Sequence, residues 1–224
     1  MNFGKFSLSE RLAIVAGLLS VASNGSYVLQ VITGAVKPAA VSWGLWSLIT
    51  VLNFGSYKSM SRNWVKSGLS LLGSIQCILI FVTALFVGTV GRIDRFDIAV
   101  AAIGVIAAVT WHSLKRHGFA KAPHLANLIV QVALTVGFIP SFRSVWANPN
   151  GESALCWFGW TLMFAVQTAV VRLNSKERAT PTQWEEFVYP VNSTLLHLLL
   201  ALTRRDSKSH VVVIRLFIRA IRHH

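Results

Sequence analysis

Long apolar runs, separated by short polar segments rich in lysine and arginine, dominate this chain. A helix needs about 20 consecutive apolar residues to cross a bilayer. By that measure six runs predict spanning helices, at residues 12–36, 39–57, 68–90, 96–112, 123–145 and 154–171. A seventh run, at residues 187–203, is shorter and contains Pro190, Asn192, Ser193 and His197. We predict a seventh span there, with a surface or re-entrant helix as the alternative.

The first run has a second interpretation as a signal peptide. Ser20-Val21-Ala22 resembles a cleavage site in both residue size and position. We prefer a spanning helix, because residues 27–38 belong to the internal repeat described next and cleavage would remove the helix that precedes them.

A short pattern occurs twice in the chain. Ser42-Trp43-Gly44-Leu45-Trp46-Ser47-Leu48 opens the second run, and Cys156-Trp157-Phe158-Gly159-Trp160-Thr161-Leu162 opens the sixth. Each copy has an amide seven residues after its second tryptophan, Asn53 in one and Gln167 in the other. Positions i, i+3 and i+10 share one face of a helix, so each copy places two indoles and an amide on a single stripe.

The ends of the first and fifth runs also match. Residues 27–38 align with residues 138–149 at a constant offset, and three extra residues in the loop 150–153 restore the alignment at the tryptophan pairs. The pattern predicts a duplication: a first three-helix repeat over residues 1–90, a linker helix over 91–117 and a second repeat over 118–203. With one linking span the two repeats are parallel, and a site is expected near mid-depth between them. The predicted fold class is thus an all-α membrane protein with seven transmembrane helices arranged 3+1+3.

Composition supports a membrane protein. The 224 residues are 54% hydrophobic and only 13% charged, whereas soluble domains have about a quarter of their residues charged. The net charge of +13 would suit nucleic acid, but the 21 lysines and arginines lie in segments that flank the runs, and no nucleic-acid motif accompanies them. We therefore expect the lipid bilayer, and no nucleic acid, as a partner.

The positions of the basic residues also bear on the C-terminal tail and on the orientation of the chain in the membrane. In residues 204–224, Arg215, Arg219 and Arg222 share one helical face, which predicts a basic amphipathic helix on the lipid surface. Lysine and arginine in the short loops favour a cytoplasmic N-terminus, while this tail favours the opposite orientation.

No pattern of enzyme chemistry is present. The runs contain no paired carboxylates, nucleophile elbow or phosphate loop, and Cys77 and Cys156 are isolated inside apolar runs. We expect no catalytic residue, no metal and no cofactor.

The three-plus-one-plus-three plan and several motifs resemble the SWEET and PQ-loop transporters. The motif residues are Pro140 near the end of the first helix of a repeat, then Gly34-x-x-Lys37-Pro38 and Ser42-Trp43-x-x-Trp46. The chain is most similar to uncharacterised bacterial seven-span members with a Pro…Trp-x-x-Trp pattern, which implies the inner membrane of a bacterium. The nicotinamide riboside carriers, of the same fold, also use membrane tryptophans. Neither repeat has the full Pro-Gln dipeptide, since Leu29-Gln30 and Pro140-Ser141 stand there.

The resemblance implies a site made by a tryptophan pair and an amide pair, here Trp46 with Trp160 and Asn192 opposite Gln76. It also implies proline hinges, which we place at Pro38, Pro140 and Pro149. Glutamine in place of asparagine in the third span argues against a symmetric sugar site. From the stripes themselves, Asn53 and Gln167 join the predicted solute-binding residues.

Each of these residues has a structural alternative. The outer tryptophans, Trp43 and Trp157, are expected in the headgroup belt, where indoles are enriched. Buried amides also join helices to one another without any ligand. A lone intramembrane histidine such as His197 is either a packing residue or a proton site.

Taken together, the residues predict a facilitator for a small neutral polar solute such as a sugar or a vitamin-like metabolite. Deep carboxylates are absent from the runs, so ion coupling has no support. The alternative is a receptor or scaffold that uses the same fold without transport. Association into a homo-oligomer is left open.

Overall fold

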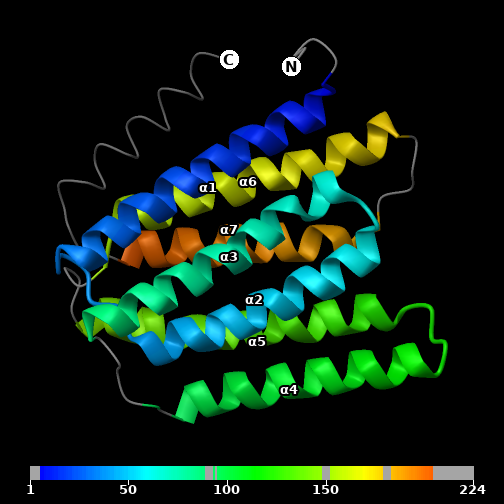
Figure 1. The fold of residues 1–224 in the computed structure, drawn as a ribbon. Coiled ribbons are helices and arrows are strands. Elements are labelled where there is room, and N and C mark those ends of the chain that lie inside the picture. The colour runs from blue at the N-terminus through cyan, green and yellow to red at the C-terminus, as the bar shows by residue number, and fades with distance from the viewer. Residues whose placement is uncertain (1–5, 89–92, 94, 148–151, 179–182, 204–224) are drawn as a thin grey trace.

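The computed structural model describes residues 6–88, 93, 95–147, 152–178 and 183–203. These residues form seven α-helices and no strand (Figure 1). The helices are α1 (Leu8–Ile32), α2 (Ala40–Ser61), α3 (Trp64–Val87), α4 (Arg95–Arg116), α5 (Ala122–Ala147), α6 (Ala154–Glu177) and α7 (Glu185–Thr203). Each of the seven predicted runs is therefore a helix, including the short seventh. The tail 204–224 and Pro149 lie outside the described residues.

Polar caps and left-handed residues fix where several helices begin and end. Ser7 and Glu10 form a reciprocal capping box at the start of α1. Asn63 caps α3 by accepting from the backbone N–H of Val65 at 2.8 Å. Arg62, with φ of 49°, ends α2, and Gly88, with φ of 81°, ends α3. The reversal between α2 and α3 is consequently tight, with only Arg62 and Asn63 between the helices.

Five of the helices in the described residues are long and apolar enough to cross a membrane: α1, α3, α4, α5 and α6. Large apolar side chains cover their outer surface; Leu18 is 65% exposed, Phe86 88% and Leu155 73%. Side chains of this kind are stable at an outer surface when lipid contacts them. The chain thus has the character of a helical integral membrane protein.

Helices consecutive in the sequence run in opposite directions, so α2 and α6 begin at one end of the molecule, and α3 and α7 begin at the other (Figure 1). Helix α3 packs on both α1 and α2, and α7 packs on both α5 and α6. Helix α1 packs on α6, α2 packs on α5, and smaller contacts join α3 to α6 and α2 to α7. Helix α4 packs on α5 and α2 at the edge (Figure 1).

Two prolines of the predicted hinge set lie in the described residues. Pro140 lies inside α5, where it supplies no backbone N–H to the helix. Pro38 lies in the connection between α1 and α2, two residues before α2 begins. Both remain predicted hinges, one within a helix and one before a helix.

Close packing of α1 on α6 depends on Gly159. A Cβ atom at this position would overlap Ser23 Oγ and lie 3.0 Å from Ser23 Cβ. We expect Gly159→Ala to destabilise the folded protein by about 1–3 kcal/mol, because the two helices must separate. Thermal unfolding in detergent measures this loss.

Gly25→Ala is the matched control, since nothing lies within 4 Å of its Cβ position and the gain in helix propensity is the same. In a Ser23→Gly background, Gly159→Ala should lose most of its effect. An equal loss in both backgrounds would show that the contact with Ser23 is not the cause.

Candidate functional site

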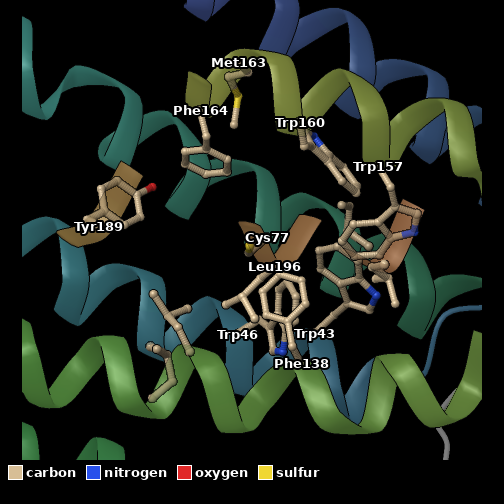
Figure 2. Close-up of a cluster of buried hydrophobic side chains, with 14 of the residues drawn as sticks. Trp43, Trp46, Cys77, Phe138, Trp157, Trp160, Met163, Phe164, Tyr189 and Leu196 are labelled. Carbon is tan, nitrogen blue, oxygen red and sulfur yellow. The ribbon is translucent and has the colours of Figure 1, made fainter. Parts of the chain in front are cut away.

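The four tryptophans of the duplicated pattern meet in the interior near the start of α2 and α6 (Figure 2). Trp43 and Trp46 come from α2, and Trp157 and Trp160 come from α6. The ring centroids of Trp43 and Trp160 are 6.2 Å apart, and those of Trp46 and Trp157 are 6.3 Å apart. The outer tryptophan of each copy therefore packs against the inner tryptophan of the other.

One aromatic ring from each first helix completes this aromatic cluster. The Tyr27 ring lies 5.4 Å from Trp43 and 5.3 Å from Trp160. The Phe138 ring lies 6.1 Å from Trp157 and 4.6 Å from Trp46. Tyr27 and Phe138 occupy aligned positions in the sequence, and each packs on the outer tryptophan of its own copy and the inner tryptophan of the other.

The expectation that Trp43 and Trp157 lie in the headgroup belt is wrong. Their exposed fractions are 8% and 2%, so both indoles are turned inward. The Trp157 indole N–H donates to Glu152 Oε2 at 3.2 Å, and the Tyr27 hydroxyl donates to the same oxygen at 2.9 Å. Because Glu152 lies in the loop before α6, it resembles an ordinary loop charge in the sequence. Its carboxylate instead holds two rings of the aromatic cluster.

A cavity of about 60 Å³ lies beside the aromatic cluster, with lining residues from α1, α2, α3, α5, α6 and α7. A water molecule needs at least about 10–15 Å³ of such space, so the cavity has room for a few waters and not for a sugar. Three of the predicted site residues line it: Trp46, Trp160 and Gln76. Most of the remaining lining is apolar or aromatic.

The other three predicted amides lie elsewhere. Asn53 is fully buried, and its Oδ1 accepts from Asn127 Nδ2 at 3.1 Å and from Gln131 Nε2 at 2.8 Å, joining α2 to α5. Asn192 is half-buried and faces α5, where its Nδ2 donates to Thr135 Oγ1 at 3.2 Å. These contacts are of the interhelical kind, and they separate Asn192 from Gln76.

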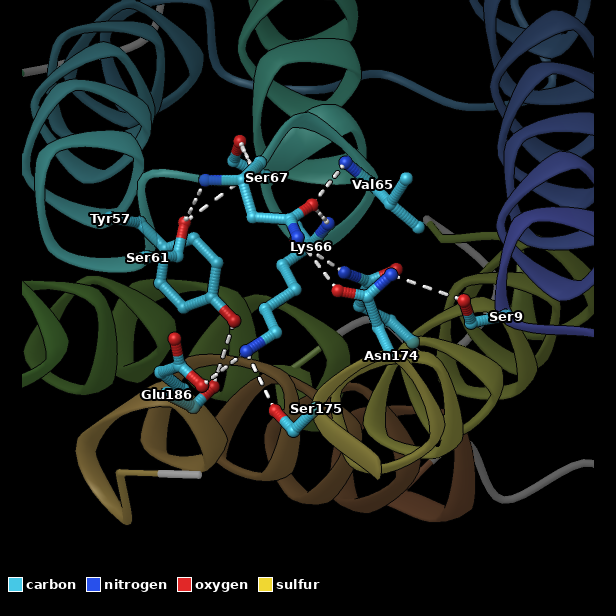
Figure 3. Close-up of polar contacts among 11 residues, drawn as sticks. Ser9, Tyr57, Ser61, Val65, Lys66, Ser67, Asn174, Ser175 and Glu186 are labelled. Carbon is cyan, nitrogen blue, oxygen red and sulfur yellow. Dashed lines mark hydrogen bonds and ion pairs between the residues drawn. The ribbon is translucent and has the colours of Figure 1, made fainter. Parts of the chain in front are cut away.

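Gln167 belongs to a polar cluster at the opposite end of the molecule, where α3 and α7 begin. Figure 3 shows Lys66, Glu186, Tyr57 and Ser175 of this cluster. Lys66 Nζ lies 2.8 Å from Glu186 Oε2, and the two residues are only 4% and 5% exposed. Gln167 Nε2 donates to the backbone carbonyl of Lys66, and the Tyr57 hydroxyl donates to that of Glu186 at 2.9 Å. Lys66 also donates to Ser175 Oγ at 2.7 Å. We call these five residues the polar clasp.

A second repeated pattern in the sequence, outside the apolar runs, contains both residues of this ion pair. Asn63-Trp64-Val65-Lys66 and Gln183-Trp184-Glu185-Glu186 have the same pattern of amide, tryptophan and a charge two residues later. Aligned on their tryptophans, they place Lys66 and Glu186 at equivalent positions. Both residues lie outside the apolar runs and therefore resemble loop charges. In the structure, α3 and α7 begin a few residues before these runs, so Lys66 and Glu186 lie in the first turns of the helices.

The two ends of the molecule are connected through the cavity wall. The Tyr189 ring, which lines the cavity, lies 5.5 Å from the Tyr57 ring of the polar clasp. On its other side Tyr189 lies 5.5 Å from Phe164, a second lining residue. The aromatic cluster thus lies at one end of the cavity, and Tyr189 at the other end joins the cavity wall to the polar clasp.

Comparison of the chain with protein-family models, with curated proteins and with solved structures finds no match. Within the described ranges no group of three or more His, Cys, Asp or Glu side chains could hold a metal ion. Functional inference for this chain therefore depends on the cavity and on the contacts that close it.

The polar clasp provides a test of buried charge pairing. Lys66→Met leaves the Glu186 carboxylate buried without its cation, so we expect a loss of about 3–5 kcal/mol in stability. The double variant Lys66→Met with Glu186→Met should recover most of this loss, because neither charge is then left unpaired. Thermal unfolding of the purified protein in detergent measures both.

Lys176→Met is the matched control, since Lys176 is an exposed lysine near the end of α6. Its effect should stay within about 0.5 kcal/mol. A double variant as unstable as Lys66→Met alone would contradict the pairing.

Proposed function

We propose that the protein is a membrane transporter that lets a small neutral polar solute cross by facilitated diffusion. Two three-helix bundles, α1–α3 and α5–α7, would rock against each other, with α4 as the linker, as parallel repeats do around a shared site. The helix contacts support this plan: each contact within or between the bundles keeps its counterpart when α1, α2 and α3 are exchanged with α5, α6 and α7. We expect it in the inner membrane of a bacterium.

The observation that carries the proposal is a central cavity with a contact between the two bundles beyond each of its ends. At one end, Trp43 of α2 packs on Trp160 of α6. At the other end, Lys66 of α3 pairs with Glu186 of α7. A carrier needs such contacts at each end, because each must break in turn while the other persists.

The contacts at the two ends are modest enough to be broken in turn. Aromatic pairs contribute about 0.5–1.5 kcal/mol each beyond the area they bury. A buried ion pair gains little net stability once its desolvation is counted, although leaving one partner alone is costly. Opening either end as a unit, with both charges reaching water together, is therefore feasible, and two such states can differ by the few kcal/mol that population exchange requires.

The cavity lining favours a neutral solute. Its polar members are Asn24, Thr50, Gln76, Tyr189, Ser193 and His197, none of which is a carboxylate or an ammonium group. A charged solute would be desolvated there without a partner of opposite charge. The same lack of a carboxylate in the lining supports a facilitator over an ion-coupled carrier.

A receptor or scaffold without transport is the second candidate. The small cavity, about 60 Å³ with a mainly apolar lining, is the observation in its favour. A protein that only packs its core could retain such a space without ever opening it.

Alkylation of Cys77 separates the two candidates without knowledge of the solute. This thiol lines the cavity and is 8% exposed. In a Cys156→Ser protein, we expect a membrane-impermeant maleimide to label Cys77 from either face, in right-side-out and in inverted vesicles. Mass spectrometry of the intact chain measures labelling.

Lys66→Met alone should raise labelling from the face at which α3 begins and lower it from the other face, because the unpaired Glu186 carboxylate destabilises only the closed form of that end. A Cys77→Ser, Cys156→Ser protein, which has no cysteine, measures the non-specific labelling. Labelling from one face only, or from neither, argues against a carrier and for the scaffold.

A further inference from the structure

One histidine is enclosed by the aromatic rings around the cavity. His197, in the middle of α7, is 7% exposed and lines the cavity. Its ring lies 5.0 Å from Phe138, 5.0 Å from Phe164 and 5.4 Å from Trp157. Rings at these separations pack against the imidazole and restrict its orientation.

A backbone contact determines which nitrogen of His197 carries the proton. Nδ1 lies 2.6 Å from the carbonyl oxygen of Ser193, one turn earlier in α7. A carbonyl oxygen only accepts, so Nδ1 must be the donor. In the neutral ring Nε2 is then an acceptor. It has no hydrogen-bond partner among the described residues.

A donor without a partner lies on another wall of the same cavity. Gln76 of α3 accepts from the Ser20 hydroxyl through Oε1 at 2.9 Å. The other polar atom of this side chain, Gln76 Nε2, has no hydrogen-bond partner in the described residues. An unpaired buried polar group costs about 1–3 kcal/mol, so Gln76 Nε2 gains from any solute that pairs with it.

We propose that His197 and Gln76 recognise an uncharged ring compound that carries an amide or lactam group. The N–H of the solute donates to His197 Nε2, Gln76 Nε2 donates to its carbonyl oxygen, and the aromatic walls stack on the ring. This assignment rests on the transporter function proposed above and names its substrate class.

The lining selects such a compound over a sugar. A sugar presents a hydroxyl group on nearly every ring carbon, and each hydroxyl buried without a partner weakens binding. Among the polar lining residues, the Thr50 hydroxyl already donates to the backbone carbonyl of Trp46 at 2.8 Å. An amide or lactam ring has few polar atoms and flat apolar faces, which match two unpaired groups set among aromatic rings.

Binding of a ring must widen the cavity. A cavity of about 150 Å³ is known to hold benzene, more than twice the volume found here. The lining includes side chains that can yield, such as Met163 and Cys77, and separation of the bundles adds space. A bound ring therefore requires a wider cavity than the one in the described conformation.

A pair of probes that differ in one donor tests the assignment. With Cys156→Ser protein in detergent, we expect 2-pyridone to protect Cys77 from N-ethylmaleimide at a concentration about three- to tenfold lower than N-methyl-2-pyridone, which lacks the N–H. Glucose should not protect. Equal protection by the two pyridones overturns the proposal, and this comparison needs no change at the site.

Two variants then locate the acceptor. His197→Phe keeps an aromatic ring but removes Nε2, so the two pyridones should protect equally. His197→Gln offers a side-chain carbonyl and should restore part of the difference. A histidine needed only for packing would leave the ratio of the two probes unchanged in a folded variant, which would overturn the role given to Nε2.

The outcome also separates this proposal from the transporter function. If glucose protects Cys77 and neither pyridone does, the substrate class is wrong and the carrier stands. If Cys77 in vesicles reacts from only one face or from neither, the carrier itself is wrong.

Discussion

Polar groups inside an apolar environment must find partners within the chain, and the arrangement of this molecule follows from that constraint. An amide left unpaired in such surroundings destabilises the folded protein by about 1–3 kcal/mol, and an unpaired charge destabilises it more. Lys66 and Glu186, each about 95% buried, therefore pair across α3 and α7. Asn53 joins α2 to α5 for the same reason. Pairing between helices, more than apolar contact, decides which helix faces lie together, since lipid satisfies an apolar face equally well.

The same constraint places the two closures of the cavity at opposite ends. Near the start of α3 and α7 the helices meet through charges, backbone carbonyls and hydroxyls. Near the start of α2 and α6 they meet through indoles, with the Glu152 carboxylate accepting from Trp157 and Tyr27. The two kinds of contact differ in their response to water. Water replaces the partners of a charge, whereas it opposes the separation of aromatic rings.

Much of the fold could be predicted from apolar runs, because a spanning helix is a local feature that 20 residues specify. The pairing of tryptophans was also visible as a repeated pattern. The direction of these side chains could not be predicted in the same way. Trp43 faces inward because it packs on α6, and Trp157 faces inward because it packs on α2, and no local pattern reveals such a contact. Asn192 faces α5 and Lys66 faces Glu186 for the same reason. The resemblance to SWEET and PQ-loop transporters predicted the position of Asn192 along α7. It did not predict which side of the helix Asn192 faces.

Unpaired atoms distinguish the amides that hold helices together from those suited to a solute. Asn53 and Asn127 each keep one atom without a partner, Nδ2 and Oδ1, yet neither residue lines the cavity, so a solute there cannot reach them. Gln76 and Asn24 also keep one such atom each, and both line the cavity. Burial alone therefore does not identify the site, because all four amides are at least 94% buried. The combination of an unpaired atom and a position on the cavity wall is the basis of the proposed site, whose centre lies at α1, α3 and α7 instead of at the aligned amides of α2 and α6.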